Sequence, residues 1–125
     1  MKKDPRVYLA QILERAERIL SFTHEGRDAF FRSHLIQDAV IRNFEIIGEA
    51  AKRVPEEFRQ LHPSIPWKGL TGLRDVLIHQ YDGVNLAEVW RIVEKELPEL
   101  KRTISTVLPP LDQLELEIAG EQEPH

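Results

Sequence analysis

The feature that most constrains the fold is the spacing of the apolar residues, which recur every three or four positions in four separate segments. That spacing is typical of amphipathic helices, and no segment shows the strict alternation of a half-buried strand. The segments are joined by short connections, which favour antiparallel neighbours. The sequence therefore predicts an all-α, antiparallel up-and-down bundle of four to five helices. The predicted helices cover about 5–23, 28–54, 66–79 and 85–107, and the segment EEFRQLH at 56–62 adds one short turn at most.

Capping residues and prolines set the expected ends of these helices. Asp4 followed by Pro5 is a typical helix start, and Pro55 should end the long second helix. Asn85 with Glu88 three positions later resembles a capping box at the start of the last helix. Pro98 lies inside that last helix and removes one backbone hydrogen bond, so we expect a kink near 94–98.

The second helix carries an apolar stripe on one side and a charged face on another. Gly48 lies beside the apolar stripe, which predicts close approach of another helix there. The charged face has two interpretations, a solvated surface with ion pairs or the border of a groove or partner surface. In the second interpretation Arg42, Glu45 and Glu49 line the cleft. The stripe contains Phe30, Phe31, Leu35, Val40, Ile41, Phe44, Ile47 and Ala51, and the charged face contains Asp38, Arg42, Glu45, Glu49 and Lys52.

Charge and composition separate a domain from a tail. The 125 residues suit one domain at 1–108, and the remaining 17 residues contain five acidic residues and no lysine or arginine. The formal net charge of -4 thus leaves residues 1–108 at +1 (-4 minus -5). This domain is not a strongly basic nucleic-acid binder, so contacts with RNA would be local or shared between subunits. We expect the acidic tail at 109–125 to be mobile, or at most to form a short helix over LDQLELEIA.

The sequence contains no cysteine, no apolar run long enough to span a membrane and no apolar stretch of a signal peptide near its first residues. We therefore expect a cytoplasmic protein without a membrane contact. Neither the histidines nor the glycines form a recognisable metal or nucleotide motif, because His34 and Asp38 supply only two possible ligands. We predict no metal site and no cofactor.

The segment RDVLIHQY at 74–81 concentrates the residues that could carry chemistry. Arginine can grip phosphate oxygens, and histidine can give or take a proton near neutral pH, which together meet the needs of metal-free RNA cleavage. Asp75 and His79 are four positions apart and share a helix face, so Asp75 could orient His79. Arg74 and His79 are about 140° apart on an ideal helix. They would converge only through a long side chain, a distorted helix end or a second subunit. A histidine near a helix end is also often a purely structural dipole partner.

RDVLIHQY resembles the signature of the HEPN superfamily, and specifically of the HepT-like toxins that pair with MNT nucleotidyltransferase antitoxins. The resemblance extends over about residues 4–108 and includes DPRVYLAQILERAERIL, QDAVIRNFEIIGEAAKRVP and HPSIPWKGLTGLRDVLIHQYDGVNLAEVW. It implies an all-α homodimer and a metal-independent endoribonuclease whose two signature sets meet at the dimer cleft. Arg74 would stabilise the phosphate and His79 would act as acid or base. Asp75 stands where the family has a polar residue, often asparagine, and its charge would orient His79 but repel phosphate.

The resemblance also gives Tyr81 a role, since in such pairs the partner enzyme transfers AMP to the signature tyrosine and silences the toxin. Added phosphates beside Arg74 would occupy the anion site and exclude RNA. A helix-end aromatic packed on the bundle is the structural alternative for Tyr81. Two functions therefore remain: a ribonuclease toxin, or a non-catalytic helical subunit whose cleft binds nucleotide or a nucleotidyltransferase.

Overall fold

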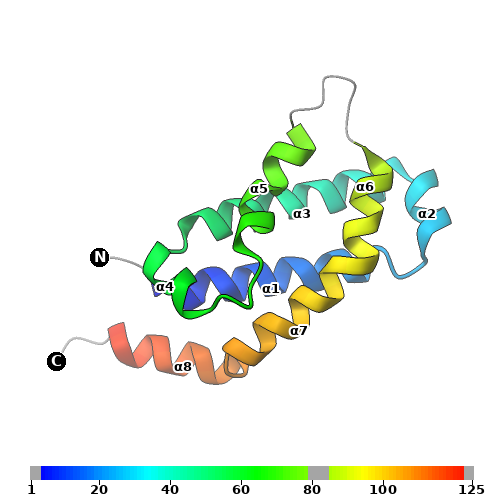
Figure 1. Ribbon diagram of the computed structural model, residues 1–125. Coiled ribbons are helices and arrows are strands. Elements are labelled where there is room, and N and C mark those ends of the chain that lie inside the picture. Colours follow the sequence, from blue (N-terminus) through cyan, green and yellow to red (C-terminus); the bar gives the residue numbers. More distant parts are fainter. Residues whose placement is uncertain (1–3, 79–84, 123–125) are drawn as a thin grey trace.

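The computed structural model describes residues 4–78 and 85–122, and within these ranges every regular element is helical (Figure 1). The all-α bundle expected from the spacing is confirmed. The helices are α1 (Pro5–Phe22), α2 (Arg27–Arg32), α3 (His34–Arg53), α4 (Glu56–Leu61), α5 (Trp67–Ile78), α6 (Leu86–Arg91), the π-helical turn η1 (Ile92–Glu96), α7 (Leu97–Val107) and α8 (Leu111–Gln122).

Two long antiparallel helices, α1 and α3, form the base of the bundle (Figure 1). Helix α5 packs on α3, and α7 packs on α1. Helix α1 begins as predicted, because the side chain of Asp4 accepts a hydrogen bond from the backbone N–H of Arg6 at 2.9 Å. Its far end is Phe22, one residue before the expected boundary.

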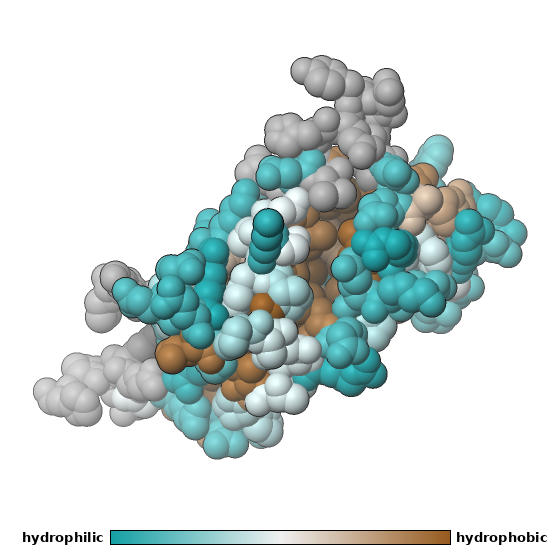
Figure 2. Space-filling view, in the orientation of Figure 1, coloured by the Kyte–Doolittle hydropathy of each residue, from teal (hydrophilic) through white to brown (hydrophobic). Residues whose placement is uncertain are grey.

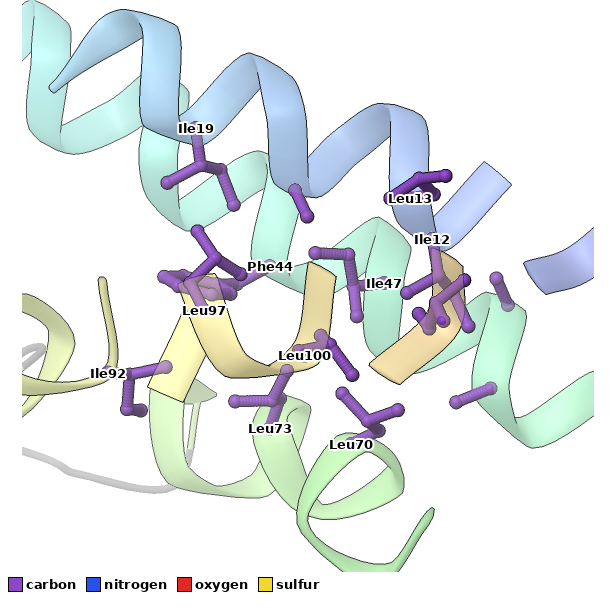
Figure 3. Packing of buried hydrophobic residues seen from close by; sticks show 14 of the residues in the cluster. Ile12, Leu13, Ile19, Phe44, Ile47, Leu70, Leu73, Ile92, Leu97 and Leu100 are labelled. Atoms are coloured by element: carbon purple, nitrogen blue, oxygen red, sulfur yellow. The ribbon is translucent and has the colours of Figure 1, made fainter. Parts of the chain in front are cut away.

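The core lies where these helices converge. Figure 3 shows Ile12 and Ile19 of α1 and Phe44 and Ile47 of α3 pointing towards side chains of α5 and α7. Gly48 is buried on α3, which agrees with the close packing predicted there. Leu35, by contrast, is 80% exposed and does not belong to the buried stripe.

The prediction of one continuous helix over 28–54 is wrong, because the chain breaks at Ser33. Ser33 is extended, and its side chain accepts a hydrogen bond from the N–H of Ile36 at 3.1 Å, which starts α3. The buried Gln37 side chain donates to the carbonyl oxygens of Phe30 (3.0 Å) and Phe31 (3.2 Å), which end α2. The break lets α2 turn towards α6, where the rings of Phe30 and Trp90 lie 5.4 Å apart.

The last long helix starts and bends where the sequence predicts. The side chain of Asn85 accepts a hydrogen bond from the N–H of Glu88 at 3.1 Å. The bend is a π-helical turn, η1, immediately before Pro98, which lacks the N–H that a regular helix would use there. Helices α6 and α7 are therefore two differently directed parts of one helical run (Figure 1).

Of the two expectations for the acidic tail, the structure shows the helix. Helix α8 covers residues 111–122, is longer than the LDQLELEIA segment, and buries Leu114 to 2% exposure. Glu117 of α8 forms an ion pair with Arg6 of α1 at 3.0 Å. Helix α4, which follows Pro55, likewise exceeds the single turn that we expected over 56–62. No helix in the described ranges is long and apolar enough to cross a membrane.

Candidate functional site

Helix α5, which carries the first part of the 74–81 signature, is fixed by its buried side and by its first turn. Leu70, Leu73 and Leu77 recur at three and four positions and are all at most 7% exposed. Before the first turn, Ile65 is buried, and the indole N–H of Trp67 donates to the carbonyl oxygen of His62 at 3.0 Å. These contacts set the direction in which the signature leaves the bundle.

The structure places only part of the predicted site. The backbone of Arg74 belongs to α5, and Asp75 is exposed on the same helix. Asp75 lies about 200° around the helix from the buried Leu73, so it belongs to the outer face. The side chain of Arg74 and the whole of His79 and Tyr81 lie outside the described residues. Whether Arg74 and His79 converge therefore stays a prediction.

Arg42, Glu45 and Glu49, which one interpretation placed along a cleft, lie on α3. Arg42 is exposed and donates to the carboxylate of Glu45 at 3.3 Å, as expected of an ion pair on a solvated helix face. None of the three lines the groove described next. Among residues 4–78 and 85–122, no group of three His, Asp or Glu side chains could hold a metal ion.

The sequence did not reveal an apolar groove that runs between α5 and the η1–α7 segment. Figure 2 shows it as a hollowed band of hydrophobic surface between hydrophilic side chains. Phe44 and Ile47 of α3 form its floor (Figure 3). Pro66, Gly69, Leu70 and Leu73 line one wall, and Ile92, Glu96, Leu97 and Leu100 line the other. A groove of this kind on a small domain is typical of a binding surface.

A charged cluster lies where α6 passes into the η1 wall of the groove. Arg91 donates to Glu88 at 2.6 Å and to Glu96 at 3.1 Å, so one guanidinium joins the helix before the π turn to the end of that turn. The hydrogen bond from Arg91 lowers the pKa of the Glu88 carboxyl. The two carboxylates in turn raise the pKa of Arg91, the hydrogen bond to Glu88 being the larger cause.

Comparison with known proteins gives this arrangement a family. The model of the family described as "Ribonuclease HepT-like" matches residues 12–107, which include α5 and the complete signature. The chain belongs to the HepT-like ribonuclease family. The family match ends before α8, so the acidic helix is an addition beside the HepT-like fold. No solved structure matches the chain significantly.

Several relatives of this HepT-like chain carry names that mention RNA cleavage. A Methanocaldococcus jannaschii protein named "Gamma-glutamylcyclotransferase and putative RNase" is 46% identical over 90% of this chain, which spans only 51% of that protein. A Caldanaerobacter subterraneus protein named "Putative RNase" is 41% identical over 85% of this chain and 96% of its own length. A Thermococcus cleftensis protein named "Probable ribonuclease HepT" is 44% identical over 81% of this chain and 93% of its own.

Proposed function

We propose that this chain is a metal-independent endoribonuclease toxin of a two-component toxin–antitoxin system. The observation that carries the proposal is the signature Arg74–Asp75–Val76–Leu77–Ile78–His79–Gln80–Tyr81, which lies within a match to the HepT-like ribonuclease family. The names of the relatives, which mention RNase or ribonuclease, support the same activity. We place the reaction in the cytoplasm.

The proposed reaction needs three functions, and the signature supplies a residue for each. His79 removes the proton from the ribose 2'-hydroxyl or returns one to the leaving 5'-oxygen. Arg74 neutralises the charge that develops on the phosphate as the 2'-oxygen attacks phosphorus and the bond to the 5'-oxygen breaks. Asp75, on the outer face of α5 one helical turn before His79, orients the imidazole.

The proposal includes two protein partners. A second copy of the chain would form a homodimer, because one helix holds Arg74 and His79 on different faces, about 140° apart. A cognate MNT-type nucleotidyltransferase would neutralise the toxin by transferring AMP to Tyr81. The new phosphate would then lie in reach of Arg74 and compete with RNA.

The test is cleavage of total RNA by purified protein in EDTA. Wild type should leave 2',3'-cyclic phosphate ends, while His79→Ala and Arg74→Ala should be inactive but fully helical. His34→Ala is the matched control, since His34 is exposed on α3 and outside the signature, and it should cleave like wild type. Equal cleavage by wild type and His79→Ala would refute the role of His79.

Modification is tested with the partner enzyme and ATP. Wild type should gain AMP by mass spectrometry and lose cleavage, whereas Tyr81→Phe should keep cleavage and gain no AMP. AMP transfer to Tyr81→Phe would show that the acceptor is another residue. A folded wild-type protein with unmodified Tyr81 that cleaves no RNA would instead support the alternative, a non-catalytic subunit that binds nucleotide or the nucleotidyltransferase. The exposed carboxylate of Asp75, which repels phosphate, is the observation in favour of that alternative.

A further inference from the structure

Two glycines of α5 have no explanation within a single copy of the chain. Gly69 and Gly72 both lie inside the helix, where glycine is less stable than alanine. A Cβ added at either position would meet no atom within 4 Å in the part of the chain that the structure describes. The buried Gly48 differs, because α3 packs around it. The space at Gly69 and Gly72 is therefore available to a backbone from another molecule.

The glycines border the apolar groove. Gly69 is one of the residues that line it, between the walls formed by α5 and by η1–α7. The hydrophobic band in Figure 2 thus continues onto the open glycine surface of α5. A surface that is apolar and allows close backbone approach fits a packed helix better than it fits a nucleic-acid backbone.

The charges beside the glycines are self-complementary. Lys68 and Asp75 are both exposed and are seven positions apart, which places them about 20° apart around an ideal helix. Gly72 lies between them along the helix, close to the midpoint. When two such helices cross antiparallel at that midpoint, Lys68 of each helix faces Asp75 of the other.

We propose that two copies of this chain pair through their α5 helices, which cross antiparallel over Gly69 and Gly72. The contact is isologous, with each Lys68 opposite Asp75 of the partner subunit, and the apolar groove is covered at the same time. A helix crossing alone is smaller than the roughly 1,200–2,000 Å² of a stable interface, so the η1 wall must contribute. This inference rests on the proposed homodimer and adds its surface and direction.

The pairing also brings the signatures of the two copies to one place. Arg74 follows Gly72 by two residues, which is about 3 Å along the helix axis. The two Arg74 positions therefore lie beside the crossing point, on either side of the two-fold axis. This arrangement fits a cleft to which both copies contribute phosphate-binding groups.

The first experiment compares Gly72→Leu with Gly120→Leu by analytical ultracentrifugation. Gly120 is the matched control, because it lies in α8 and a Cβ there also meets nothing within 4 Å. We expect a wild-type dimer, a Gly120→Leu dimer, and a Gly72→Leu protein with unchanged helix content whose dimer dissociation constant is higher by about tenfold or more. A Gly72→Leu protein that dimerises like wild type would overturn the α5 surface but leave the homodimer. A monomeric wild type would overturn the homodimer itself.

The second experiment tests the antiparallel direction by exchanging charges. Lys68→Glu and Asp75→Lys should each weaken the dimer, and the double variant should restore it, because opposite charges again face each other. A double variant that dimerises no better than either single variant would refute this register. Total RNA binding is measured in the His79→Ala background. If Gly72→Leu loses RNA affinity there but keeps the dimer, the glycine surface contacts RNA and the inference is wrong.

Discussion

Replacing Ile47 with aspartate tests the arrangement of the core most directly. Ile47 is 0% exposed in the middle of α3 and lies between α1, α5 and α7 (Figure 3). The substitution loses about 1.5–3 kcal/mol of apolar burial. It also buries a carboxylate without a partner, which costs several kcal/mol more. Together these terms approach the roughly 5–15 kcal/mol that stabilises a typical domain.

We therefore expect Ile47→Asp to lose its helical signal in far-UV circular dichroism. Ile47→Val should remain folded and cost about 0.5–1.5 kcal/mol in urea unfolding. Leu35→Asp is the control on the same helix, because Leu35 is 80% exposed and an acidic residue suits the first turn. It should change the free energy of unfolding little. A folded Ile47→Asp protein with the wild-type spectrum would show that α3 presents a different side to the core.

Three further variants test the local contacts. Leu114→Ala removes the buried residue of α8 and should cost the α8 contact about 2–5 kcal/mol; amide exchange should rise across 111–122 and not in α3. Equal acceleration in both helices would show that α8 and the core unfold together. Ser33→Ala removes the cap of α3 and should lower the free energy of unfolding by about 1 kcal/mol in urea, whereas an unchanged midpoint would refute the capping role. The lowered pKa of Glu88 means that its contribution to stability is present above its unfolded pKa and is lost as pH falls through the folded pKa. Glu88→Gln should therefore lose less stability than wild type on acidification, and parallel urea curves across the acid range would contradict this.

The helices could be predicted because each buries one stripe, and a stripe leaves a regular spacing in the sequence. The α2–α3 break left no such mark, since Phe30 and Phe31 precede Ser33 with spacing that also fits a continuous helix. The turn depends on the buried Gln37 side chain, which bonds to the last carbonyls of α2. That contact spans six to seven residues, and periodicity does not detect it.

The signature could be found because its residue types and spacing are local, but the groove beside it could not. A groove forms where two helices fail to close over a third, and this depends on the angle between α5 and α7. The sequence does carry a signal for it, since Gly69 and Gly72 lie in a helix that also has to hold Leu70 and Leu73 in the core. We attributed those glycines to a weak helix start, whereas α5 includes both without interruption.

The proposed pairing also bears on the charge of Asp75, which is unusual for a residue that adjoins an RNA phosphate. An isolated carboxylate on the outer face of α5 would weaken RNA binding by repulsion. Opposite Lys68 of the partner subunit, the same carboxylate is compensated, and its second oxygen remains able to accept a hydrogen bond from His79. Dimer formation would then do two things at once, because it would bring the Arg74 positions together and reduce the repulsion beside them. On this reasoning a monomeric variant loses RNA cleavage even when its own signature is intact.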